Sequence, residues 1–265
     1  MKIQTRESIL DIVIAEGPPE LEEIDLIPIE AHIGAQEFDE EKFLEWLRWI
    51  KENDQAFVVF MGDNFEFATR DSVGDVYTQK KPPEGQMEWA VEILTPLANA
   101  NKILGMLSGN HEERCYRATG IDPTKWVARV LGVPYFSDGQ GVLKIRFGRG
   151  ANGKPIAYTV HLSHGRSGAR TPGGKLNAAW RATDVVWNAD VYLVGHTHGL
   201  LTGRQDRLEF DERNNNIRRE KYYVVVAGSF LQYASYSKKA VWAPLGTGAP
   251  RVRLNGRRRD IHVSI

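Results

Sequence analysis

The sequence predicts an α/β fold in which two β-sheets pack against each other and helices cover their outer faces. Short runs rich in Val, Ile and Leu alternate with amphipathic stretches through the first half of the chain, and strand-like runs dominate from about Gly132 onward. The 265 residues have a hydrophobic content of 42%, which is enough to bury a large core. We therefore expect one domain spanning residues 1–265.

Apolar runs bounded by turn residues are predicted to be buried strands. Those of central interest are residues 24–29, 57–61, 103–108, 157–163 and 191–194. Residues 1–23 form an acidic lead-in, in which a short strand is expected from Ile9 to Ala15 before Gly17-Pro18-Pro19 breaks it.

Three segments have the apolar spacing of amphipathic helices. Residues 38–53 carry Asp39 as a plausible N-cap, followed by Phe43, Trp46, Leu47 and Ile50. We expect this Trp-containing stripe to pack into the core. Residues 86–100 repeat the pattern, although Pro96 should kink or shorten that helix. Asp122-Pro123 is typical of an N-cap with proline at the first helical position, and it opens a third helix.

The second half of the chain supplies further strands and one hairpin. The strand candidates are residues 141–147, 155–163, 191–195, 221–228 and 260–265. Residues 204–221 are charged and contain an Asn-rich turn, so a hairpin insertion with a solvated face is expected there.

Short polar motifs follow five of the apolar runs, in chain order. They are Glu30-Ala31-His32, Gly62-Asp63, Gly109-Asn110-His111-Glu112, His164-Gly165 and Gly195-His196-Thr197-His198. Because ligands collect beyond the carboxyl ends of strands in open sheets, these motifs should meet in one crevice. Five of the seven histidines fall within them, which indicates a metal-dependent hydrolase.

The ordered motifs resemble the calcineurin-like metallophosphoesterase superfamily, whose pattern runs D-x-H, G-D, G-N-H-D/E, H and G-H-x-H. The resemblance covers nearly the whole chain and implies a four-layer αββα sandwich with two bound metals. For the first metal it implies the ligands Glu30, His32, Asp63 and His198. For the second it implies Asp63, Asn110, His164 and His196, with Asp63 bridging the two. Residues 164–174, HGRSGARTPGG, are further similar to metallophosphoesterases encoded by phages and prophages.

One position departs from the family pattern, because Glu30 stands where the family has aspartate. A glutamate can still ligate, but its side chain is one methylene longer. Direct ligation, displacement of the first metal and ligation through water therefore remain alternatives.

The implied site suits phosphate-ester hydrolysis. Two divalent ions can hold an attacking hydroxide between them and neutralise phosphoryl oxygens. Nitrogen and oxygen ligands without thiolate favour Mn, Fe, Zn, Ni or Mg. Two such ions bring four positive charges, and Glu30, Asp63 and the hydroxide remove three, so a locally electropositive pocket is expected in a chain of zero net charge.

Other residues are expected to assist this chemistry. By family position, His111 contacts the phosphoryl group or protonates the leaving oxygen, and Glu112 is expected to orient it. Glu66 is either a second orienting carboxylate or a surface residue. Arg166 and Arg170 flank a glycine-rich loop, where they either reach substrate phosphate or are solvated.

A basic cluster near the C-terminus offers a separate possibility. Its five arginines are Arg251, Arg253, Arg257, Arg258 and Arg259. The cluster either binds a nucleic-acid backbone or is an exposed strand edge and its turn.

Composition excludes several protein classes. With one cysteine, Cys115, the chain has no intrachain disulfide framework and no thiolate zinc site. Asp11 and Glu16 interrupt the first apolar run, unlike a signal peptide, and no run is long enough to span a bilayer. We expect a cytoplasmic protein without membrane partners.

The sequence thus predicts a two-metal phosphoesterase that acts on phosphodiesters of nucleotide or nucleic-acid type. One alternative is a phosphomonoesterase acting on nucleotide or phosphoprotein. The other is a non-catalytic scaffold that keeps the fold and binds a partner.

Overall fold

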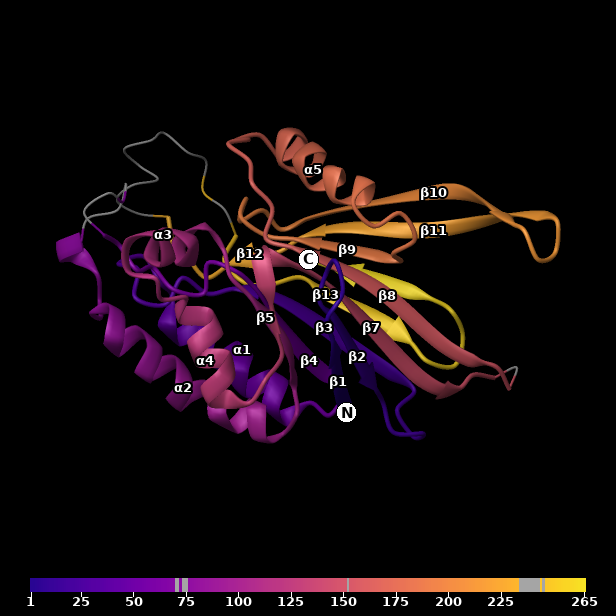
Figure 1. Cartoon of the computed structure of the whole chain (residues 1–265), viewed down its shortest axis with the longest axis horizontal. Coiled ribbons are helices and arrows are strands. Elements are labelled where there is room, and N and C mark those ends of the chain that lie inside the picture. The colour runs from indigo at the N-terminus through magenta and orange to yellow at the C-terminus, as the bar shows by residue number, and fades with distance from the viewer. Residues whose placement is uncertain (70–71, 73–75, 152, 234–243, 245) are drawn as a thin grey trace.

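The computed structural model describes the chain except for residues 70–71, 73–75, 152, 234–243 and 245. Its two sheets pack face to face, and helices cover both outer faces (Figure 1). The predicted four-layer αββα sandwich is confirmed. No helix in the described part of the chain combines the length and apolar character needed to cross a bilayer.

The first sheet is mixed and contains the N-terminal residues. From edge to edge its strands are β1 (Lys2–Arg6), β2 (Ile12–Glu16), β7 (Gln140–Arg149), β8 (Pro155–Ser163), β9 (Val191–Val194), β11 (Asn216–Val226) and β10 (Leu201–Asp211). The lead-in therefore contributes two strands where one was expected. The sequence did not predict β1 because this edge strand is almost wholly exposed and shows no apolar alternation.

The second sheet contains the strands that end in the first motifs. Its order is β14 (Ile261–Ser264), β13 (Arg251–Asn255), β3 (Glu23–Glu30), β4 (Ala56–Met61), β5 (Ile103–Leu107) and β6 (Tyr135–Phe136), and β12 (Gly228–Ser229) pairs with β3. Strands β3, β4 and β5 are parallel, so their carboxyl ends meet at one edge of the sheet.

The helices lie in two outer layers. They are α1 (Glu40–Glu52), α2 (Pro83–Asn99), α3 (Asn110–Thr119), α4 (Pro123–Leu131) and α5 (Pro172–Trp180), with short 3₁₀ turns at Val76–Thr78, Ser137–Gly139 and Arg181–Asp184. Residues of α1, α2 and α4 pack on the second sheet, whereas α5 packs on the first (Figure 1).

Strand β3 shows why the apolar runs are continuous. Ile27 and Ile29 face the helices of the second sheet, and Ile24 and Leu26 face the core between the sheets. A strand buried on both faces needs apolar residues at nearly every position. The five central runs were predicted as strands for this reason.

Two helices differ in detail from the structure that the sequence predicts. Pro96 does not end α2, which continues to Asn99. Pro96 lies on an exposed face near the end of the helix, where water can satisfy the carbonyl that its missing N–H leaves free. In α1, Asp39 caps the helix through Lys42 N, and Phe43, Leu47 and Ile50 are buried, but Trp46 is only half-buried.

Candidate metal centre and active site

The carboxyl ends of five strands bring the five motifs together. Glu30 is the last residue of β3, Asp63 follows β4, and Asn110 opens α3 after β5. From the first sheet, His164 follows β8 and His196 follows β9. Parallel pairing within each sheet places all of these ends at one edge of the sandwich.

The first group of donor atoms comes from Glu30, His32, Asp63 and His198, and these atoms all lie within 4.8 Å of one another. The Nε2 atoms of His32 and His198 are 2.9 Å apart. Glu30 Oε2 lies 3.5 Å from His198 Nε2 and 4.0 Å from His32 Nε2. The four side chains therefore converge on one small volume.

The second group comprises Asp63, His164 and His196, so Asp63 belongs to both. Asp63 Oδ1 lies 3.5 Å from His164 Nε2. Asn110 Oδ1 joins this group at 3.1 Å from His164 Nε2 and 2.7 Å from His196 Nδ1. All seven residues predicted as metal ligands are thus brought together.

Backbone carbonyls fix the rotation of the imidazoles in the second group. His164 donates from Nδ1 to the carbonyl of Met61 at 2.9 Å, which leaves Nε2 facing Asp63. His196 donates from Nε2 to the carbonyl of Ser167 at 3.1 Å, which leaves Nδ1 facing Asn110. Holding the outer nitrogen protonated presents the inner lone pair to a metal.

The buried charges indicate that a cation belongs at this site. Glu30 is 0% exposed, and its Oε2 atom has no hydrogen-bond partner among the described residues. Burial raises the pKa of Glu30 well above its usual value, and burial together with His198 and His111 lowers that of His32. Glu30 Oε1 accepts a hydrogen bond from His196 N at 2.7 Å, but a buried carboxylate whose other oxygen faces imidazole nitrogens without a partner is costly unless a positive ion lies between them. The donor set therefore fits divalent metals.

The carboxylate of Asp63 differs from that of Glu30. Burial alone would raise the pKa of Asp63, but His164, His111 and His32 outweigh it and hold that pKa well below its usual value. His111 also donates its backbone N–H to Asp63 Oδ1 at 3.0 Å. Asp63 is therefore held as an anion at the centre of the site.

Four motif residues have a strained backbone conformation. His32 (φ 56°), Asp63 (46°), His196 (70°) and His198 (53°) all occupy the left-handed region, which costs a non-glycine residue roughly 1–2 kcal/mol. Such turns aim side chains from strand ends into the crevice. Gly195 permits the close approach, since a Cβ there would lie 2.7 Å from Glu30 Oε1.

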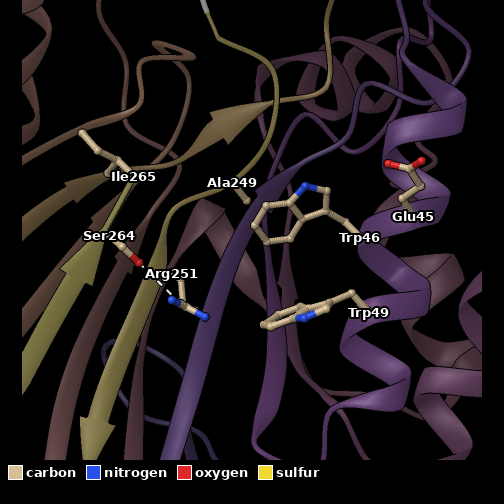
Figure 2. Close-up of a pocket in the computed structure, with 7 residues that line it drawn as sticks. All are labelled: Glu45, Trp46, Trp49, Ala249, Arg251, Ser264 and Ile265. Carbon is tan, nitrogen blue, oxygen red and sulfur yellow. Dashed lines mark hydrogen bonds between the residues drawn. The ribbon is translucent and has the colours of Figure 1, made fainter.

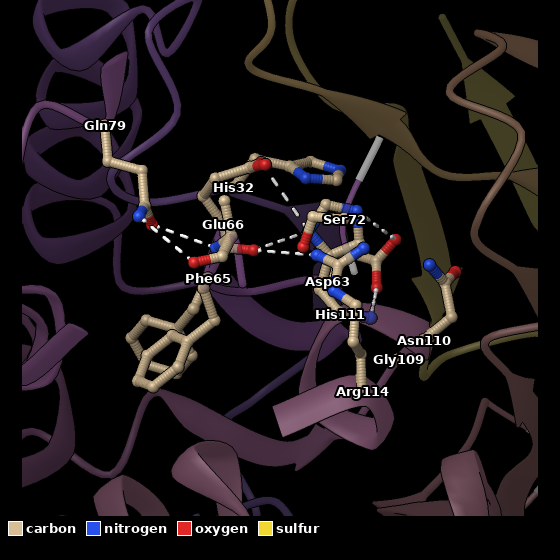
Figure 3. A network of polar contacts seen from close by, with 12 residues as sticks. His32, Asp63, Phe65, Glu66, Ser72, Gln79, Gly109, Asn110, His111 and Arg114 are labelled. Carbon is tan, nitrogen blue, oxygen red and sulfur yellow. Dashed lines mark hydrogen bonds and ion pairs between the residues drawn. The ribbon is translucent and has the colours of Figure 1, made fainter. Parts of the chain in front are cut away.

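His111 lies beside the first donor group and is oriented by the segment after Asp63 (Figure 3). Its Nδ1 donates to the carbonyl of Glu66 at 2.9 Å, and its Nε2 lies 3.9 Å from Asp63 Oδ2. Arg114 donates to the same carbonyl, and the Glu66 carboxylate is 3.5 Å from Nδ1. Burial lowers the pKa of His111, but Asp63 and Glu66 outweigh it and raise the pKa above the usual value.

Glu112 does not orient His111 as predicted. Its two oxygens instead accept hydrogen bonds from four backbone amides, those of Asp63, Asn64, Phe65 and Gly109. Because Glu112 is the third residue of α3, its side chain reaches back to the Gly109 N–H in the manner of a capping box. It fixes two motif loops relative to each other, and the carboxylates that lie beside the His111 ring are those of Glu66 and Asp63.

The loop after His164 reaches the site through its backbone. Ser167 supplies the carbonyl that orients His196, while Arg166 and Arg170 are exposed. Lys175, a buried side chain on α5, is a site residue that no sequence motif predicted. Burial lowers its pKa and Glu30 opposes that shift, so its charge acts on the metal site. Neither this lysine nor the orienting carbonyls belong to a motif, so no sequence pattern could have indicated them.

The C-terminal arginines do not form an unpaired cationic surface. Arg251 and Arg253 face Asp25, Arg257 pairs with Glu22, Arg258 with Asp260, and Arg259 with Asp190. Strand β13, which carries the first two, is an interior strand of the second sheet. These carboxylates, of which all but Asp260 are distant in sequence, neutralise much of the positive charge of the cluster.

A cavity of about 480 Å³ lies elsewhere, between α1 and the last two strands (Figure 2). Trp46 and Trp49 form one wall, and Arg251, Ser264 and Ile265 lie opposite. None of the predicted metal ligands lines it.

Comparison with known proteins agrees with this geometry. The calcineurin-like phosphoesterase family matches residues 31–200, a range that spans the motifs from His32 to His198. The chain belongs to this family. With its cluster of metal-binding residues, it is a metal-dependent phosphoesterase.

Similarity to individual proteins is remote. Vps29 from Entamoeba histolytica, solved with Zn²⁺, is 13% identical with a TM-score of 0.41, over 91% of this chain and 97% of that one. A predicted phosphoesterase from Streptococcus pneumoniae is also 13% identical, with a TM-score of 0.34, over 91% and 93%. A search of curated proteins finds no match.

Proposed function

We propose that this protein uses two divalent metal ions to hydrolyse phosphodiesters of nucleotide or nucleic-acid type. The observation that carries the proposal is the position of Asp63 in both donor groups. One carboxylate shared by two sets of ligands is the arrangement that a pair of ions requires. Glu30, His32 and His198 would complete one set, and Asn110, His164 and His196 the other.

When bound, such ions neutralise phosphoryl oxygens and lower the pKa of an attacking water. The remaining tasks fall to this chain's own residues. His111 keeps Nδ1 bonded to the Glu66 carbonyl, so Nε2 faces the site beside Asp63. From that atom His111 can donate a proton to the leaving oxygen.

The preference for diesters rests on the loop after His164 and on its similarity to phage enzymes. Arg166 and Arg170 are exposed on this loop, while the loop backbone holds His196. Guanidinium groups in this position are suited to contact substrate phosphates beyond the one being cleaved. A phosphomonoesterase remains the alternative.

The test combines metal content with activity. Elemental mass spectrometry of the purified protein should find about two metals per chain, since a shared carboxylate serves a pair. Hydrolysis of bis-p-nitrophenyl phosphate and of p-nitrophenyl phosphate is measured before and after Mn²⁺ is added. Asp63→Ala and His196→Ala should abolish turnover, whereas His262→Ala, an exposed residue outside the motifs, should leave it unchanged.

The outcomes distinguish the alternatives. Preference for the diester supports the full proposal, and a strong monoester preference replaces it with a phosphatase. Full activity of either site variant would contradict the mechanism. Absence of metal and of turnover with any divalent ion would favour the scaffold.

A further inference from the structure

A lysine beside the metal centre is buried without a partner. Lys175, in the first turn of α5, is 7% exposed, and its ammonium has no hydrogen-bond acceptor and no ion-pair partner among the residues that the structure describes. Burying an ammonium in this way is costly. The first turn is also the end of a helix where the dipole disfavours a cation. Neither burial nor helix stability therefore explains why a lysine stands here.

The other buried lysine in the described part of the chain shows how such a charge is normally accommodated. Lys102 is 6% exposed, and its ammonium donates to the backbone carbonyls of Asn53 and Ala56. These acceptors replace the water that burial removes. The described residues offer no equivalent acceptor to Lys175, so its ammonium is available to bind an anion.

The side chain of Lys175 runs along the turn that carries the last metal ligand. Its Cδ lies against Gly199, where an added Cβ would be 3.4 Å from it, and Gly199 directly follows His198. Burial lowers the pKa of Lys175, and the charge of Glu30 opposes that shift. Burial is also the main cause of the low pKa of His198, about 4, and the charge of Lys175 contributes to it. The ammonium thus lies close to Glu30 and His198, at the side of the first donor group.

The charges at this point limit what can lie between them. A divalent ion held by the first donor group would repel the ammonium of Lys175, and this repulsion is strong where water is excluded. An anionic oxygen between the two positive charges would remove the repulsion. In a phosphoesterase the substrate supplies such oxygens, and a lysine ammonium is a common partner of phosphate.

We propose that Lys175 binds a phosphoryl oxygen of the substrate and so sets how tightly the enzyme holds phosphate. The inference rests on the proposed hydrolysis of phosphate esters at this metal centre. Lys175 would contribute to binding of the phosphoryl group, whereas His111 is assigned to the leaving oxygen. A neutral side chain at position 175 should weaken the binding of substrate and of inorganic phosphate without removing the metals.

The test measures phosphate binding and turnover in the manganese-loaded full chain. Isothermal titration calorimetry with inorganic phosphate gives the affinity, and hydrolysis of bis-p-nitrophenyl phosphate gives kcat and KM. Lys175→Met keeps a long side chain without the charge. It should weaken phosphate binding roughly ten- to a hundred-fold, the usual effect of losing a charged hydrogen bond. KM should rise more than kcat falls, and manganese content should equal that of the wild type.

Two further variants serve as controls. Lys175→Arg keeps the charge and should bind phosphate more tightly than Lys175→Met. Lys51→Met removes a lysine that is exposed on α1, and it should behave as the wild type. Far-UV circular dichroism establishes that each protein is folded, and Lys175→Gln takes the place of Lys175→Met if the latter does not fold.

The outcomes separate this inference from the proposed function. A folded, manganese-loaded Lys175→Met variant that binds phosphate as tightly as the wild type would overturn the inference and leave the proposed function intact. Loss of manganese from that variant would overturn it too, because the lysine would then act on the metal ligands. A wild type without turnover on any phosphate ester would contradict the proposed function, and the phosphate affinities of the two proteins would still decide the role of Lys175.

Discussion

At the scale of single residues, the site depends on which nitrogen of each histidine faces inward. The carbonyls of Met61 and Ser167 decide this for His164 and His196, and the carbonyl of Glu66 decides it for His111. The motifs predicted which side chains would gather, because their types and order are written in the chain. They could not predict these carbonyl contacts, since every residue has a carbonyl and only the fold selects one.

The role of His111 gives a prediction at this scale. His111→Gln should lower kcat by about 10²–10⁴, the usual contribution of a general acid. Metal content should stay unchanged, because His111 is not among the predicted ligands of the two implied metals. The loss should be larger for an alkyl phosphate ester than for a p-nitrophenyl ester, whose leaving oxygen needs no proton. Steady-state kinetics and elemental analysis measure both effects. Equal losses on the two esters would show that His111 does not protonate the leaving group.

At the scale of elements, the turns that follow the strands position most of the metal-site side chains. The apolar runs predicted the central strands because burial on both faces demands continuous apolar sequence. The same reasoning missed α5, whose PGGKLNAAW sequence contains two glycines, although Thr171 caps it through Gly174 N and Pro172 is its first residue. It also missed α3, which begins inside a motif at Asn110. In α5 the weak helix propensity of the glycines is overridden by contacts that only the fold supplies.

Glu112, at the start of α3, gives a prediction for this element. Glutamine in its place has one acceptor oxygen and one NH₂ group, so part of the four-amide cluster would face a donor. Glu112→Gln should therefore reduce the free energy of unfolding by about 2–5 kcal/mol, from buried amides left unpaired. Burial raises the pKa of Glu112 to about 6, so denaturant unfolding is best measured well above that pH.

The neighbouring residue provides the control for this measurement. Glu113 is half-exposed and pairs with Arg117 one turn along the helix. Glu113→Gln should change stability by less than about 0.5 kcal/mol. Similar effects of both substitutions would mean that the Glu112 amide contacts do not hold the two loops.

At the scale of the whole molecule, two sheets from different parts of the chain each contribute half of the site. Sequence alternation predicted the layers, but not which charged residues meet on neighbouring strands of a sheet. Asp25 of β3, for example, lies beside Arg253, 228 residues later in the chain. For the same reason the sequence left open whether the arginine cluster binds nucleic acid or is a strand edge with its turn, whereas the fold places a carboxylate beside each arginine.

In this layered core, the buried His161 should lower the free energy of unfolding at acidic pH. This side chain is fully buried between the first sheet and its outer helix, 5.9 Å from Tyr192 between ring centres. Burial lowers its pKa from 6.5 to about 4, and the backbone of Ala182 offsets only part of that shift. As pH falls below 6.5, His161 binds a proton in the unfolded chain but not in the folded chain. The free energy of unfolding therefore falls until the pH passes the pKa that His161 has in the folded state. The full loss is about 3 kcal/mol.

His161→Leu should remove this component, so that its free energy of unfolding declines less than that of the wild type between neutral pH and pH about 4. His262→Gln, on the exposed face of β14, should follow the wild type. Because the histidines of the metal site titrate in all three proteins, the difference between the curves isolates His161, and parallel curves for the wild type and His161→Leu would contradict the prediction.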